Sequence, residues 1–139
     1  MEEQRMTKQQ FEALSDFRHQ LRRFVRWSEQ LTQQAGVTNL QYLLMLHVKG
    51  QSGRDWATIS ELAEHLQAHH HGTVALVTRC EKLGWVYRQP GHPDGRTVEV
   101  HLTEPGEALV QRLAWQHREE LLRLQGVLRI PDRQQLDPP

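Results

Sequence analysis

The sequence predicts a mainly α-helical protein that carries one small β-hairpin. Three patterns support this fold class. Residues 11–35 and 104–129 place apolar side chains three and four positions apart, which is the period of an amphipathic helix. Residues 59–83 hold two shorter helical patterns separated by a brief break. Residues 85–102 alternate with period two on both sides of a Pro- and Gly-rich turn, as a β-hairpin does.

Length and composition indicate one globular domain. A chain of 139 residues can bury about two thirds of its unfolded surface, so it needs no disulfide or metal to fold. Its 24% charged and 37% hydrophobic residues include no apolar run near the ~20 residues that a membrane span needs. The N-terminal "MEEQRMTKQQ" is not a secretion signal, and the single Cys80 cannot form an intramolecular disulfide. We therefore expect a cytoplasmic protein.

The charge balance restricts how the protein could bind nucleic acid. The formal net charge is zero, from 17 basic and 17 acidic residues, which argues against a surface that is basic all over. Residues 69–100 have a small basic excess, with four Lys and Arg, three acidic residues and four histidines. Local charge would have to account for any such binding.

The first two helices follow from spacing and end signals. Apolar residues from Phe11 onward predict a long amphipathic helix that ends at Gly36. The next run, "LQYLLMLHVKG", is apolar almost all round, so we expect a buried helix, capped by Thr38 or Asn39 and ending at Gly50.

A short helix and a longer one follow. In "ATISELAEHLQ", Ser60 is the expected N-cap, and a break at "QAHH" separates this helix from the next. The longer helix covers about residues 70–83 and Gly84 ends it. Its expected buried face is Thr73, Leu76, Val77, Cys80 and Leu83, and its opposite face is His71, Val74, Ala75, Thr78 and Lys82.

The hairpin and the last helix complete the order. The hairpin covers about residues 86–102, and Thr103 then caps a helix that we expect to reach about residue 129, with a tail, "RIPDRQQLDPP", that frays. Helix, turn, helix and two-stranded ribbon is the order of a winged helix-turn-helix, in which the second helix enters the DNA major groove and the hairpin tip reaches the backbone or minor groove. The alternative is a mixed helical domain with an incidental hairpin.

Specific motifs favour the DNA-binding interpretation. They occupy Leu62, Ala63 and Leu66; Leu76, Val77, Arg79 and Glu81; Gly84 and Trp85; Asp94 and Arg96; and Leu102, Thr103 and Gly106. With these residues, segment 58–110 resembles the MarR (multiple antibiotic resistance regulator) family of transcription factors. The helices outside this segment fit the family by order and length only.

The resemblance implies a dimeric regulator that represses transcription and that a small-molecule effector releases from DNA. It implies one domain, 1–139, with dimerisation helices in 1–36 and 104–139 and a winged helix-turn-helix lobe in 37–103. It also implies a pseudo-palindromic double-stranded DNA operator and a small aromatic or phenolic effector in the cleft between arm and lobe. Members of the family commonly have a further helix after the last one predicted here, where this chain has only the short tail.

The histidines of "HLQAHHHGTVAL" have three alternative roles. His65 and His69 have the i, i+4 spacing of zinc ligands, but they straddle the helix break and have no acidic or Cys residue at ligand spacing. The resemblance places His70 and His71 at the N-terminus of the recognition helix, where phosphate oxygens bind. A solvated surface is the third alternative, and DNA contact is the one that we favour.

Other residues are candidates for DNA contact. Arg96, at the wing tip, suits a narrow A·T-rich minor groove, and the resemblance suggests that Asp94 orients it; a salt bridge between the two that holds the turn is the alternative. Lys82 and Arg88 are expected at phosphates, or else on a solvated face. Arg79 is either a DNA contact or a structural partner of Glu81 or the wing. With His70, His71, Val74, Ala75 and Thr78, these residues form the predicted DNA-binding set.

The remaining residues do not indicate catalysis. Cys80 is either a redox sensor or a small buried hydrophobe, and its apolar helix face favours the second. The four tryptophans are expected in the core or in an interface. We find no phosphate loop, activated nucleophile or carboxylate pair, so we expect neither an enzyme nor a cofactor. A protein-interaction module and a metal-dependent regulator that uses the histidines are the rival functions.

Overall fold

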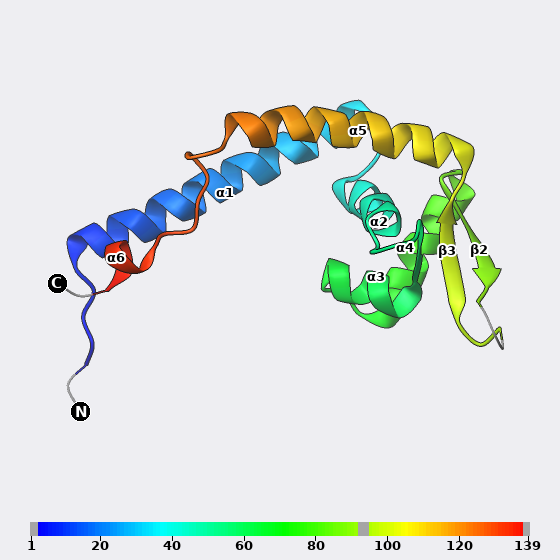
Figure 1. The fold of residues 1–139 in the computed structure, drawn as a ribbon, viewed down its shortest axis with the longest axis horizontal. Helices are drawn as coiled ribbons and strands as arrows, with labels where there is room; N and C mark the ends of the chain where they lie inside the picture. Colours follow the sequence, from blue (N-terminus) through cyan, green and yellow to red (C-terminus); the bar gives the residue numbers. More distant parts are fainter. Residues whose placement is uncertain (1–2, 92–94, 138–139) are drawn as a thin grey trace.

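The protein consists of a long helical arm with a small lobe at one end (Figure 1). A computed structural model describes residues 3–91 and 95–137. The arm pairs the first and last long helices, and a short helix near the C-terminus lies beside the start of the chain. The arm elements are α1 (Lys8–Gln34), α5 (Glu104–Arg123) and α6 (Arg133–Leu136). The predicted class, mainly α-helical with a winged helix-turn-helix, is confirmed.

The lobe combines three helices with a small antiparallel sheet. Its elements are α2 (Asn39–Lys49), β1 (Trp56–Thr58), α3 (Ile59–Leu66), α4 (His70–Lys82), β2 (Val86–Pro90) and β3 (Val98–Leu102). The strand order is β1-β3-β2, and the register pairs Trp56 with His101 and His101 with Tyr87. Alternation places these three side chains on one face and Val100 on the other, where it is fully buried. The sheet thus covers one side of the lobe core.

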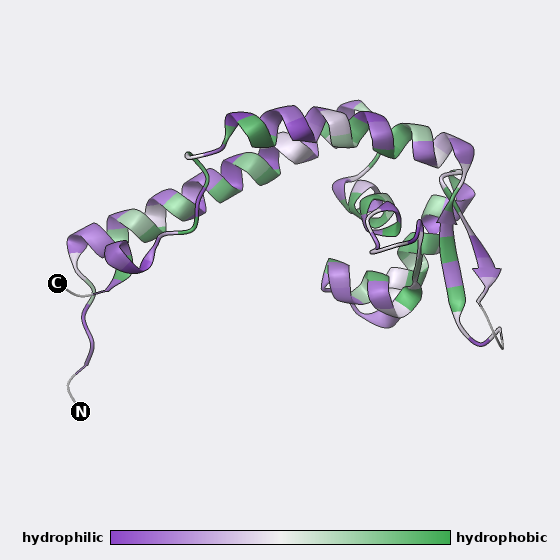
Figure 2. Cartoon of the chain, viewed as in Figure 1, coloured by the Kyte–Doolittle hydropathy of each residue, from purple (hydrophilic) through white to green (hydrophobic). Residues whose placement is uncertain are grey.

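The core lies mainly in the lobe and at its junction with α5. Its fully buried side chains include Leu44, Met45 and Leu62, and Leu113 of α5 joins them. The arm contributes fewer buried apolar residues, and hydrophilic residues are interspersed with hydrophobic ones along α1 (Figure 2). In the described parts of the chain, no helix is both long enough and apolar enough to cross a membrane.

Local capping explains where several helices begin. Thr103 is the N-cap of α5, as predicted, and Thr38, one of the two candidates, is the N-cap of α2. Thr103 also ties α5 to the base of the wing, because its backbone N–H donates to Trp85 O (3.0 Å) and its hydroxyl donates to Gly84 O (2.6 Å). A Cβ at Gly106 would lie 2.0 Å from Trp85 O, so only glycine permits this close approach. The Leu-Thr-x-x-Gly motif therefore has a packing reason.

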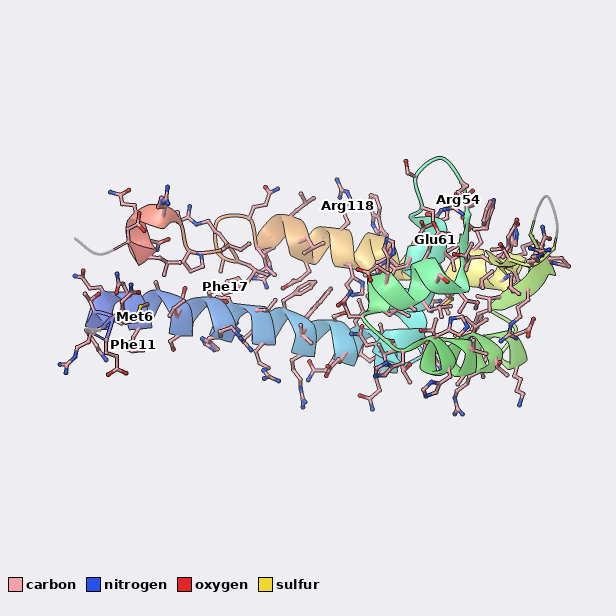
Figure 3. All side chains as sticks on the ribbon, turned by 90° about the horizontal axis from the view of Figure 1, so that it is seen from below. Met6, Phe11, Phe17, Arg54, Glu61 and Arg118 are labelled. Atoms are coloured by element: carbon pink, nitrogen blue, oxygen red, sulfur yellow. The ribbon has the colours of Figure 1, made fainter. Side chains whose placement is uncertain are left out.

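Two predictions about the centre of the chain were wrong. The N-cap of α3 is Thr58 and not Ser60, because Thr58 forms a capping box with Glu61, whose carboxylate accepts from the Thr58 N–H at 2.9 Å. The predicted two-stranded ribbon is in fact part of a three-stranded sheet, since β1 pairs with β3. Arg54 pairs with Glu61 and lies 4.1 Å from the centre of the Trp56 ring, which ties β1 to α3 (Figure 3).

The C-terminal predictions were also wrong. Helix α5 ends at Arg123 and not near residue 129, and Gly126 then takes a left-handed conformation (φ +82°) in the segment that leads to α6. The tail does not fray: α6 packs on α1, and Gln10 Nε2 donates to Leu136 O at 2.9 Å. A further short helix therefore follows α5.

Candidate nucleic-acid interface

Helix α4 has one buried face and one open face. Thr73, Val77 and Cys80 are buried against the lobe core. Of the predicted contacts on α4, Val74 and Thr78 are half-buried, and the others are exposed: His70, His71, Ala75, Arg79 and Lys82. Leu83, expected on the buried face, is 50% exposed. The structure thus gathers the α4 members of the predicted set on one accessible side.

Arg88 fixes the wing to α4. Its Nη1 donates to Glu81 Oε1 (2.6 Å), while Nη2 donates to Thr78 Oγ1 (2.7 Å) and to Val74 O (3.2 Å). The Arg88 backbone N–H donates to the other Glu81 carboxylate oxygen at 3.1 Å. Of the two alternatives for Arg88, the solvated face is wrong, because this side chain is 27% exposed and bonded to three residues of α4. Glu81 thus pairs with Arg88. The alternative in which Glu81 pairs with Arg79 is wrong.

A cleft separates α4 from the wing. It has a volume of about 380 Å³, and Ser60, His70, Val74, Arg88 and Arg96 are among its lining residues. Arg96 is exposed in the loop before β3. Asp94, its expected partner, lies outside the described residues. Two arginine side chains and a histidine therefore line a hollow between α4 and the wing.

The clustered histidines flank a helix break, as expected. Helix α3 ends at Leu66, and Gln67 then takes a left-handed conformation (φ +51°). His69 is the N-cap of α4 without a side-chain capping bond, and its ring stacks on that of His71 with centroids 6.2 Å apart. Within residues 3–91 and 95–137, no three His, Cys, Asp or Glu side chains are grouped as a metal site. Because the helix breaks between His65 and His69, their i, i+4 spacing does not place them on one helical face.

Cys80 is a buried hydrophobe, as predicted. Its side chain is fully buried, and burial raises the pKa of its thiol to about 11. Such a thiol carries almost no thiolate at neutral pH, which disfavours a redox sensor.

Among the tryptophans, Trp115 departs from a core position, since it is 58% exposed and Arg118 lies 4.8 Å from its ring centre.

A polar aromatic cluster joins the arm to the lobe, and sequence reasoning did not find it. His117 of α5 is buried, accepts or donates a hydrogen bond with Ser28 Oγ (2.7 Å), and stacks on Tyr42 at 4.6 Å. Trp27 and Phe24 of α1 contact the same ring edge-on, at 5.2 and 6.5 Å. These two aromatic residues also line a crevice of about 410 Å³ between α1 and the end of α5.

Comparison with known proteins agrees with this geometry. The model of the MarR family matches residues 35–97, which contain the helix-turn-helix and the start of the wing. This segment is similar to the MarR family over slightly less than half of the chain. The resemblance predicted from the motifs is thereby confirmed.

One curated relative of the chain is a transcriptional regulator. The HTH-type transcriptional regulator PecS of Dickeya dadantii is 32% identical over 60 residues, which are 43% of this chain and 36% of PecS. The match thus spans about a third of the length of that relative.

Solved structures share the fold over most of the chain. AbsC, a MarR family transcriptional regulator from Streptomyces coelicolor, has a TM-score of 0.76 at 22% identity and covers 87% of this chain and 81% of its own. MepR, a transcription regulator of the Staphylococcus aureus multidrug efflux pump MepA, has a TM-score of 0.68 at 22% identity and 79% coverage of each chain. A MepR variant bound to an oligodeoxyribonucleotide has a TM-score of 0.63 at 23% identity, with 81% of each chain covered.

Proposed function

We propose that this protein is a sequence-specific, DNA-binding transcriptional regulator, and specifically a repressor that a small molecule releases. The observation that carries the proposal is the set of hydrogen bonds from the Arg88 guanidinium to Glu81, Thr78 and Val74. It fixes the wing to α4 while the outer side of α4 stays accessible. A rigid helix and wing on one side of a lobe can meet the major groove and the adjacent minor groove together. A protein-interaction module would need no such cationic cleft between them.

The predicted contacts divide into two classes. Val74, Ala75 and Thr78 lie along the middle of α4, where side chains reach base edges. The residues that would contact phosphates, or the minor groove in the case of Arg96, are His70, His71, Arg79, Lys82, Arg88 and Arg96, and Asp94 would orient Arg96. Phosphate contacts fix the register of the protein, and base contacts supply specificity.

We propose a two-fold dimer built from the arm. Phe11, Leu14, Leu21 and Val25 form an exposed apolar stripe on α1 with helical spacing. Figure 3 shows Phe11 on the side of α1 away from the returning C-terminal segment and Phe17 on the side toward it. The end of α5 and the tail add exposed Leu121, Leu122, Val127 and Ile130. Such a large apolar surface suits burial against a second copy. A two-fold dimer would bind half-sites about 10 bp apart, or a multiple of that.

The crevice between α1 and α5 is the proposed effector site. Its aromatic walls, Phe24 and Trp27, suit a small aromatic or phenolic molecule. Both walls contact His117, which stacks on Tyr42 of α2, so an occupant would bear on the junction between arm and lobe. Effector binding that changes this junction would change the spacing of two α4 helices, and DNA would in turn weaken effector binding.

The experiment is to recover the DNA that the protein enriches from fragmented genomic DNA and to measure the affinity of that DNA by fluorescence anisotropy. We expect a recurrent pseudo-palindrome, and a lower affinity as salt rises because phosphate contacts release counterions. Recovery of fragments without a shared sequence would contradict the proposal. Arg118→Gln, on the outer side of α5, is a control variant that should bind the same DNA as the wild type.

A further inference from the structure

We propose that His47 and His65 form a two-histidine site for a divalent transition metal of the Zn²⁺, Ni²⁺ and Cu²⁺ class, on the surface between α2 and α3. His47 lies in the last turn of α2, and His65 lies in the last turn of α3. Their ring centroids are 5.0 Å apart, with an angle of 52° between the ring planes. The sequence pattern pairs His65 with His69, so this partner becomes apparent only in the fold.

The distance between the rings suits a shared ion. With metal–nitrogen bonds of about 2.0–2.1 Å and a tetrahedral angle, the centres of two imidazoles on one ion lie about 5 Å apart. The rings are tilted and not parallel, so they do not form a simple stack. Two helices packed on each other thus hold two imidazoles at a spacing that a chelate requires.

The hydrogen bond of His65 fixes its tautomer in the form that binds metal. His65 Nδ1 lies 2.8 Å from the carbonyl oxygen of Glu61. Since a carbonyl oxygen only accepts, Nδ1 carries the hydrogen, and the neutral ring keeps a lone pair on Nε2. A bond from the second ring nitrogen to a carbonyl is the usual outer-shell support of a metal-bound histidine.

The surroundings favour neutral imidazole at the second ligand. Burial, and then the neighbouring His65, lower the pKa of His47. Lys49, the cation on the same turn of α2, is engaged by Glu107 (2.8 Å) and Asp55 (3.3 Å). The two carboxylates therefore offset the positive charge of Lys49, which lies two residues from His47.

The ligand set determines the kind of site. Within the described ranges, no third His, Cys, Asp or Glu completes the group, so water would fill the other positions. Such a site is exchangeable, and its affinities should rise from Ni²⁺ to Cu²⁺ and fall again to Zn²⁺. The ion would link α2 to α3, so binding should raise the thermal stability of the lobe.

The test is calorimetric titration of the full chain, free of any histidine tag, with NiCl₂ in the absence of DNA. We expect one ion per chain, with binding weakened about tenfold or more in His47→Gln and in His65→Gln. The matched control is His69→Gln/His71→Gln, which removes the other close histidine pair and should leave binding unchanged. A rise in melting temperature with NiCl₂ should occur in the wild type and the control and be absent in the two single variants.

Three results would overturn the site: no binding to the wild type, wild-type affinity in both single variants, or loss of binding in the control. Should a single variant fail to fold, NMR of the wild type decides, because Ni²⁺ should selectively broaden the ring signals of His47 and His65. Broadening confined to His69, His70 and His71 would refute the proposal. Since no step uses DNA, the result is independent of the proposed regulatory function.

Discussion

Replacing Arg88 by methionine tests whether the wing is held to α4 by the guanidinium. The change keeps most of the aliphatic stem and removes the bonds to Glu81, Thr78 and Val74 O. A hydrogen bond to a charged group contributes about 1.5–3 kcal/mol and a neutral one about 1 kcal/mol. The Arg88 and Glu81 side chains are 27% and 37% exposed, so water replaces part of this energy. We expect the free energy of unfolding to fall by about 2 kcal/mol.

The assay is urea denaturation followed by circular dichroism, at one fixed protein concentration because a dimer would make the midpoint depend on concentration. Glu81→Gln should cost about half as much, since a neutral amide still accepts hydrogen bonds. Arg79→Met is the matched control: Arg79 is exposed on the same helix, and its loss should change stability by less than about 0.5 kcal/mol. An equal decrease in the free energy of unfolding in Arg88→Met and Arg79→Met would refute the claim that Arg88 holds the wing to α4.

Three further predictions concern other positions. Gly106→Ala should lower the free energy of unfolding by about 3 kcal/mol or more because its Cβ would collide with Trp85 O, whereas Gly72→Ala, with open space around it, should be neutral or stabilising; equal effects in urea denaturation would contradict the packing. Cys80→Ser should cost about 1–3 kcal/mol, since it buries a hydroxyl in an apolar site, and native Cys80 should react slowly with a thiol reagent; rapid labelling at neutral pH would count against burial. Arg96→Ala should weaken operator binding by about 1–3 kcal/mol without changing the melting temperature, and unchanged anisotropy at fixed salt would exclude a DNA contact there.

The sequence predicted the features that depend on neighbouring residues. The cap Thr103, and Thr38 as one of two candidates, could be predicted because a capping residue acts on amides two or three positions away. The cap of α3 was placed two residues late, although Thr58 and Glu61 have the Ser/Thr-x-x-Glu spacing of a capping box. Alternation and turn residues also indicated the wing, because both signals lie within one short segment.

Features that depend on contacts between residues far apart in the chain could not be predicted from the sequence. Strand β1 has three residues, too few for a clear alternation, and it is defined by pairing with β3 about forty residues later. The partners of Arg88 are seven to fourteen residues away across a turn. The apolar period continues past Arg123, so the end of α5 depends on Gly126 and on the contact of the tail with Gln10. Burial of Cys80, in contrast, followed from its helix face.

The most direct measurement of the central claim compares two DNAs and two proteins by fluorescence anisotropy at one salt concentration. The DNAs are the enriched genomic sequence and a scrambled duplex of equal length and composition. The proteins are the wild type and Ala75→Glu, which places a carboxylate on the exposed side of α4. The proposed function predicts that the wild type binds the enriched sequence about 10³-fold or more tightly than the scrambled one, and that Ala75→Glu loses this preference while its melting temperature is unchanged. Equal affinity of the wild type for both DNAs, or full preference in Ala75→Glu, would contradict a reading of DNA by α4.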